Sequence, residues 1–225
     1  MLPAPVVQAL DRVVRDHPGE PVVFDADGTL WRGDVGEDFL RFAVHHRHVR
    51  GSYDSYEQLL AEDPARAYGY CVEVMSGVEE AVIAKLCDDF FRERFTGRLF
   101  SFVRPLLEKL EDAGHPTWVC SASPWWNVVP GALALGIPKE RVIGVTCPVE
   151  NGVLTGVVDP PVPAGPGKVK WLERRGVKPA LAVGNGDLDL DMLAFARTAL
   201  VIAPPDSSNG LVAEGHRRGW PILKT

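Results

Sequence analysis

The chain of 225 residues is acidic and has ordinary globular composition, with 46% hydrophobic and 24% charged residues and a net charge of −6. Because phosphate backbones are bound through clustered Lys and Arg, this balance argues against nucleic acid as a partner. No run is apolar enough to span a membrane and the N-terminus lacks a signal-peptide pattern, so we expect a cytoplasmic protein. The four cysteines lack CxxC spacing, which predicts reduced, buried thiols.

Strand and helix patterns alternate along most of the chain. An amphipathic helix is expected to end near His17 and Pro18. Apolar, β-branched runs bounded by turn residues then predict five strands: 22–25, 117–121, 141–145, 180–183 and 199–202. The segment VENGVLTGVV predicts a β-hairpin that turns at Asn151 and Gly152.

One interval breaks this alternation. Residues 35–96 carry only helical patterns, which indicates a helical insertion. We therefore predict an α/β fold, a Rossmann-like doubly wound parallel sheet core with an inserted helical cap domain. The core would comprise residues 1–34 plus 97–225, and the cap residues 35–96.

Polar residues follow several predicted strands at the carboxyl edge, where such sheets bind ligands. Asp25 and Asp27 end the first strand in FDADGT, and Ser121 ends the second in TWVCSAS. Lys168 enters a helix from the loop in GPGKVKWL, and Asn185 and Asp189 follow a strand in VGNGDLDLD. Each segment alone is weak, since Asp followed by Gly is a common turn and Lys168 has a rival in Lys170.

In this order the four segments resemble the motifs of the haloacid dehalogenase superfamily. The helical insertion resembles the cap of its phosphoserine phosphatase-like branch, and FDADGTLW, SASPWW and GN are similar to phosphorylcholine phosphatase-like hydrolases. The resemblance implies a Mg²⁺-dependent phosphomonoesterase acting on a small-molecule phosphomonoester through an aspartyl phosphate on Asp25. A phosphotransferase using the same residues, and a weakly active binding or regulatory module, stay open, whereas Asp27 argues against a dehalogenase.

The resemblance also assigns roles to individual residues. Asp25 is the expected nucleophile and Asp27 the general acid and base, while Ser121, the N–H of Ala122 and Lys168 hold phosphoryl oxygens. Asp25, the Asp27 carbonyl, Asn185 and Asp189 are the expected Mg²⁺ site, with Asp189 acting through water or by steadying Lys168. Asn185 replaces the more common Asp, which lowers the ligand charge by one. Asp187 and Asp191 are expected to be solvated.

Two further residues bear on the substrate. Asp34 occupies the position at which phosphoserine phosphatases carry an acid that meets the substrate amine, but it is equally credible as a helix N-cap before Val35. Trp31 lies near the first motif, where an indole face binds alkylammonium ions, although packing in the interior is the simpler interpretation. A phosphocholine-like or amino phosphomonoester is therefore a hypothesis that rests on these two residues. The histidines of HHRH, 45–48, are expected to be a solvated helix end and not a metal site.

Overall fold

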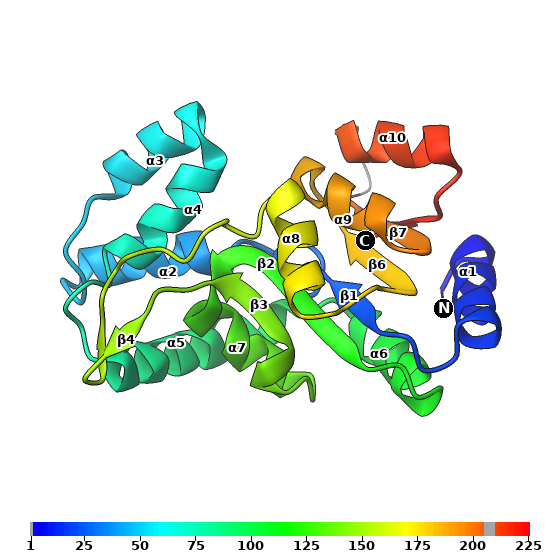
Figure 1. Ribbon diagram of the computed structural model, residues 1–225, viewed down its shortest axis with the longest axis horizontal. Coiled ribbons are helices and arrows are strands. Elements are labelled where there is room, and N and C mark those ends of the chain that lie inside the picture. Colours follow the sequence, from blue (N-terminus) through cyan, green and yellow to red (C-terminus); the bar gives the residue numbers. More distant parts are fainter. Residues whose placement is uncertain (1, 205–209) are drawn as a thin grey trace. The chain divides into compact units, whose positions relative to one another are not determined.

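A computed structural model describes residues 2–204 and 210–225 of the chain (Figure 1). The chain divides into two compact units. The first, here the core unit, comprises Met1–Arg32, Leu99–Cys120 and Gly165–Thr225, and the second, here the helical unit, comprises Gly33–Arg98 and Ser121–Ala164.

The sheet has six strands in the order β3-β2-β1-β6-β7-β8. The pairs β1–β2, β1–β6, β6–β7 and β7–β8 are parallel, which confirms the predicted α/β class. All five predicted strands exist, and β8 is an additional strand whose sequence was too short to predict it. The bounds are β1 Val22–Phe24, β2 Thr117–Pro124, β3 Val142–Val145, β6 Leu181–Gly184, β7 Thr198–Ala203 and β8 Ile222–Lys224.

The central strands are buried on both faces. Every residue of β1 and of β6 is buried, which is typical of parallel strands covered by helices on both sides. In the register, Phe24 lies opposite Val119 of β2 and Val183 of β6. Asp25 is therefore the first residue beyond the end of β1, at the carboxyl edge of the sheet.

The core unit contains five α-helices among its described residues. The predicted N-terminal helix is α1 Ala4–Asp16, which ends directly before His17. The others are α6 Val103–Asp112, α8 Pro166–Arg174, α9 Leu190–Phe195 and α10 Gly210–Arg218, with a short 3₁₀ turn, η3 Asp187–Asp189, before α9. Helices α6, α8, α9 and α10 lie in connections between strands of the sheet, whereas α1 precedes β1.

The helical unit is built from α2 Val35–His45, α3 Tyr53–Glu62, α4 Pro64–Glu73, α5 Glu80–Arg94 and α7 Trp125–Ala134, with 3₁₀ turns η1 Thr96–Arg98 and η2 Lys139–Arg141. Residues 35–96 contain no strand, as predicted. The unit also takes in residues 121–164, which the predicted boundaries gave to the core, because α7 packs against α5 and α2.

The predicted hairpin is confirmed as β4 Val149–Glu150 paired antiparallel with β5 Val153–Leu154. Asn151 and Gly152 have φ of 52° and 80°, the left-handed conformation that a type I′ turn requires. The cysteines Cys71, Cys87, Cys120 and Cys147 are buried free thiols, as expected. Within residues 2–204 and 210–225, no helix combines the length and the apolar character needed to cross a membrane.

Candidate active site

The loop after β1 brings two carboxylates and a hydroxyl to the carboxyl edge of the core unit's strands. The N–H of Asp25 donates to the carbonyl of Val183, which extends the β1–β6 pairing by one residue. Beyond it the chain turns sharply, with Leu30 N–H donating to the Ala26 carbonyl. Gly28 makes this turn possible, because its φ of 72° is one that other residues rarely adopt.

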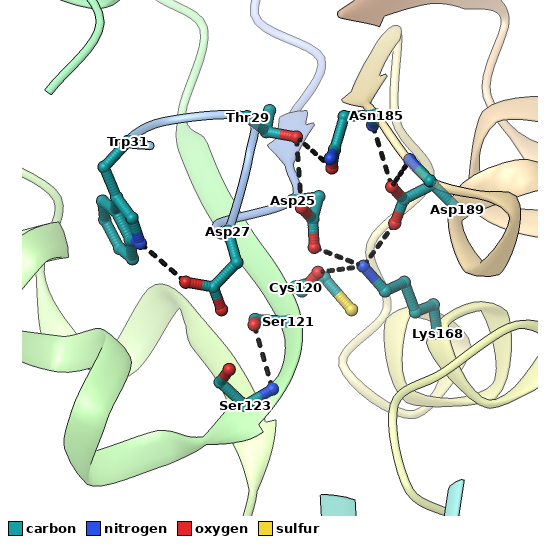
Figure 2. A network of polar contacts seen from close by, with 11 residues as sticks. Asp25, Asp27, Thr29, Trp31, Cys120, Ser121, Ser123, Lys168, Asn185 and Asp189 are labelled. Atoms are coloured by element: carbon teal, nitrogen blue, oxygen red, sulfur yellow. Dashed lines mark hydrogen bonds and ion pairs between the residues drawn. The ribbon is translucent and has the colours of Figure 1, made fainter. Parts of the chain in front are cut away.

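Lys168 forms the centre of a buried polar network (Figure 2). Its side chain is 1% exposed, and Nζ donates to Asp25 Oδ1 at 2.7 Å, to Asp189 Oδ1 at 2.5 Å and to the carbonyl of Cys120 at 2.8 Å. An ammonium group has three N–H donors, so each has an acceptor. Lys170, the rival in sequence, is exposed, and the structure thus supports Lys168 as the motif lysine.

The charges in this network do not balance. One ammonium faces two carboxylates, and the cluster carries excess negative charge in a buried place. Burial, together with the neighbouring Asp189 carboxylate, raises the pKa of Asp25 to about 6, although Lys168 opposes the shift. Burial acts to lower the pKa of Lys168, but the carboxylates of Asp189 and Asp25 outweigh it and raise that pKa above its ordinary value. Lys168 is therefore a fixed cation, and a further cation would stabilise the ionised form of Asp25.

Asp189 has donors on both of its carboxylate oxygens. Oδ1 accepts from Lys168, and Oδ2 accepts from the backbone N–H groups of Asn185 at 2.9 Å and Gly186 at 3.0 Å. Of the two predicted roles for Asp189, these contacts favour the one in which it steadies Lys168. They also hold the loop that carries Asn185.

Oxygen atoms of three expected metal ligands gather beside Thr29. The side-chain oxygen of Asn185 lies 2.9 Å from the carbonyl oxygen of Asp27, 3.2 Å from Asp25 Oδ2 and 3.0 Å from Thr29 Oγ1. Neighbouring ligand oxygens of an octahedral Mg²⁺ site with bonds of about 2.1 Å lie about 3 Å apart, so the donor set fits such an ion. If the amide is reversed, its nitrogen donates to the same three atoms, because all three are acceptors.

This donor set contains few charged ligands. The described residues hold no group of three His, Cys, Asp or Glu side chains arranged to bind a metal. The three oxygens gathered beside Thr29 come from one carboxylate, one backbone carbonyl and one amide, which are hard donors, and the fourth predicted member, Asp189, bonds Lys168 instead. Asp187 and Asp191 are exposed, as expected, and so are His45 and His48.

Ser121 and Ala122 lie on the part of β2 that belongs to the helical unit. Ser121 is 1% exposed, and its Oγ accepts from the N–H of Ser123 at 3.1 Å. It directly follows Cys120, whose carbonyl accepts from Lys168. Their role in holding phosphoryl oxygens stays a prediction.

Asp34 is the N-cap of α2, as one of its two interpretations required. Its Oδ1 accepts from the N–H of Glu37 at 2.8 Å, and burial raises its pKa to about 6. The capping role is confirmed and leaves the predicted contact with a substrate amine untested.

Trp31 does not lie where a substrate could stack on it. The side chain is 0% exposed, and the indole Nε1 donates to Asp27 Oδ1 at 2.7 Å. The structure therefore does not support the expected cation–π role, and gives Trp31 a polar contact with Asp27 instead.

Sequence reasoning missed two members of the site. Thr29 is completely buried, with Oγ1 3.1 Å from Asp25 Oδ2, and the signal for it was present as the threonine of DADGT. The Cys120 carbonyl had no signal, because a backbone acceptor does not depend on the side chain. Burial raises the pKa of the Cys120 thiol to about 12, which keeps it protonated beside the carboxylates.

Comparison with known proteins identifies the family. The family model described as haloacid dehalogenase-like hydrolase matches residues 22–194, which include all four motifs. The chain belongs to the haloacid dehalogenase-like hydrolases. Its sequence is 31% identical over 199 residues to a phosphoserine phosphatase of Halobacterium salinarum (strain ATCC 29341 / DSM 671 / R1), covering 81% of this chain and 85% of the relative. The chain is an enzyme of the phosphatase type within this family.

Two solved structures share the fold of this hydrolase. A protein of unknown function from Bordetella pertussis Tohama I superposes with a TM-score of 0.79 at 17% identity, covering 92% of this chain and 98% of the other. A structure described as a phospho-aspartyl intermediate analogue of phosphoserine phosphatase superposes with a TM-score of 0.61 at 18% identity, covering 91% and 92%. At these identities the likeness concerns the fold alone.

Proposed function

We propose that this hydrolase is a Mg²⁺-dependent phosphomonoesterase that cleaves a small phosphate ester through an aspartyl phosphate on Asp25. The observation that carries the proposal is the environment of the Asp25 carboxylate. Its Oδ1 accepts a hydrogen bond from the Lys168 ammonium at 2.7 Å. Its Oδ2 lies beside the side-chain oxygen of Asn185, which in turn lies beside the carbonyl oxygen of Asp27. A carboxylate held in this way has a defined orientation, and the excess negative charge around it favours a bound cation.

In the first half of the reaction, Asp25 attacks phosphorus while the bond to the leaving oxygen breaks, and Asp27 gives that oxygen a proton. In the second half, Asp27 takes a proton from a water molecule as the water oxygen attacks phosphorus. The bond between phosphorus and Asp25 breaks, and inorganic phosphate is released. Lys168 keeps its proton throughout and stabilises charge on the phosphoryl oxygens and on Asp25. By the family resemblance, Ser121 and the N–H of Ala122 hold further phosphoryl oxygens.

Asp25, the Asp27 carbonyl and Asn185 would hold the metal ion. When bound, Mg²⁺ would neutralise the carboxylate and polarise the phosphoryl group, so that charge repulsion no longer opposes attack. Asp189 would act on this site through the N–H groups of the loop that it orders.

The experiment is a screen of small phosphomonoesters with and without Mg²⁺, which measures released phosphate. We expect metal-dependent turnover by the wild type, its loss in Asp25→Asn, and little change in Asp191→Asn, which alters an exposed acid of α9. Acid quenching during turnover, followed by mass spectrometry, should find phosphate on the peptide that contains Asp25. Full activity of Asp25→Asn would contradict the proposal.

For the leaving group we propose an alcohol that carries an amine or a quaternary ammonium, because Asp34 supplies a partly buried carboxylate. Phosphoserine and phosphocholine should then be cleaved with higher kcat/KM than glycerol phosphate. Asp34→Asn should reduce that preference, since it removes the charge and keeps a good N-cap. An unchanged preference would leave Asp34 with the capping role alone. Transfer to an alcohol acceptor instead of water would appear as phosphorylated alcohol in place of free phosphate.

A further inference from the structure

Trp31 is a buried aromatic residue whose polar atom is directed to the acidic group that the proposed reaction needs. Its indole Nε1 donates to Asp27 Oδ1 at 2.7 Å, as Figure 2 shows, and the ring has no exposed surface. Asp27 itself is partly exposed. A solvent-accessible carboxylate is thus held by a donor fixed in the interior.

The backbone holds Trp31 on both sides. Its carbonyl accepts from the N–H of Gly28 at 2.8 Å, which closes the loop that carries Asp27. Trp31 also forms a β-bridge with Leu99, and the N–H of Phe100 donates to the carbonyl of Leu30 at 3.1 Å. Leu99 is where the chain re-enters the core unit. The backbone that carries the indole is therefore anchored by two segments of the core unit that are far apart in sequence.

A carboxyl group needs such an anchor because rotation about its last torsion is soft. The terminal torsion of Asp has broad, roughly two-fold preferences, so an unrestrained carboxyl samples many directions. An indole N–H is a donor only, and it orients the carboxyl without exchanging a proton with it. Misplacement of a reacting group by about 1 Å can cost on the order of a hundredfold in rate.

We propose that Trp31 is a positioning residue that aims the Asp27 carboxyl at the leaving-group oxygen. This inference rests on the proposed function, in which Asp27 protonates that oxygen. It replaces the expected contact of Trp31 with substrate by an action through Asp27.

The consequence is a defect that depends on the leaving group. An alkoxide needs a proton as it departs, whereas p-nitrophenolate departs readily without one. Trp31→Phe, which removes the N–H, should lower kcat for an alkyl phosphomonoester by about ten- to a hundredfold, with KM nearly constant. Its kcat for p-nitrophenyl phosphate should fall by less than about threefold.

Trp126→Phe is the matched control. Trp126 is also buried, and its Nε1 donates to a carboxylate, Glu80, at 3.1 Å within the helical unit. The same chemical change there should not produce a difference between the two substrates. If Trp31→Phe does not fold, benzothienylalanine at position 31 keeps the ring size and replaces the N–H with sulfur.

A double-mutant cycle gives the second readout. In Asp27→Asn, the loss of the Trp31 N–H should have no further effect on alkyl ester cleavage, because the group that it positions is gone. The inference would be overturned, while the proposed function stands, if Trp31→Phe lowered kcat equally on both substrates. It would also be overturned if the losses of kcat caused by Trp31→Phe and Asp27→Asn multiplied in the double variant. A wild type without turnover of any phosphomonoester would overturn the proposed function and this inference with it.

Discussion

The Lys168 ammonium lies 2.7 Å from Oδ1 of Asp25, although 143 residues separate the two in sequence. Both side chains are almost completely buried, and Lys168 also bonds Asp189 at 2.5 Å. Removing one partner of a buried ion pair leaves uncompensated charge, which costs more than the loss of the contact. The stability of the metal-free core unit should therefore depend strongly on Lys168.

We expect Lys168→Met to lower the free energy of unfolding by about 3–5 kcal/mol without metal at neutral pH. Urea denaturation followed by circular dichroism measures this change. Lys170→Met, two residues along the same helix but exposed, is the control and should be nearly neutral. Equal stability of the two variants would show that the buried network contributes little.

Asn185→Asp should increase Mg²⁺ affinity roughly tenfold, because it adds one ligand charge to the oxygen group. The metal-free variant should be less stable than the wild type, since three carboxylates would then share one ammonium. Titration calorimetry and thermal unfolding measure the two effects. Asn151→Asp is the control, because it adds the same charge in the hairpin turn and should leave the Mg²⁺ affinity unchanged. If Asn185→Asp also left the Mg²⁺ affinity unchanged, the metal site would have to lie elsewhere.

Gly28→Ala should abolish Mg²⁺ binding and reduce turnover by more than about a hundredfold, since a misplaced first loop disrupts the whole donor set. A Cβ there would lie 2.2 Å from Nδ2 of Asn185, and the φ of 72° disfavours alanine. Gly19→Ala separates the two causes, because Gly19 has a φ of 73° and no atom within 4 Å of its Cβ position. The control should lose only about 1–2 kcal/mol of stability and retain activity. Comparable activity in both variants would contradict the close approach of Asn185.

The pH dependence of stability should report Asp34. Because burial raises its pKa to about 6, the folded protein binds this proton more tightly than the unfolded chain does. The resulting stability is fully present below the unfolded pKa near 4 and is lost as pH rises through about 6. The stability difference between wild type and Asp34→Asn should thus shift toward the wild type by on the order of 1 kcal/mol between pH 7 and pH 5.

Asp63→Asn is the control for this effect. Asp63 caps α4 in the same way, through the N–H of Arg66, but it is exposed. Its difference from the wild type should stay constant over the same interval of pH, measured by urea denaturation at each pH. The same behaviour in both variants would show that Asp34 is not desolvated.

The sequence by itself determined the class of fold and the identity of the motif residues. Continuous apolar runs such as Val22–Phe24 predict buried parallel strands, and the ends of such strands share one edge of a sheet. That rule places Asp25, Asn185 and Asp189 at one edge of the sheet from the sequence alone. It missed β8, whose three residues are too few to carry a period.

Only the tertiary structure decided which atoms meet. Whether Lys168 or Lys170 reaches Asp25 depends on the helical phase at the start of α8. Cys120 accepts a hydrogen bond from Lys168 through its backbone carbonyl, a group that every residue possesses. For Trp31 the structure supports interior packing, the simpler of its two interpretations, and adds a hydrogen bond to Asp27. Local sequence reports that an indole lies near a motif, but the backbone that carries it is held by Leu99 and Phe100, which are distant in the chain.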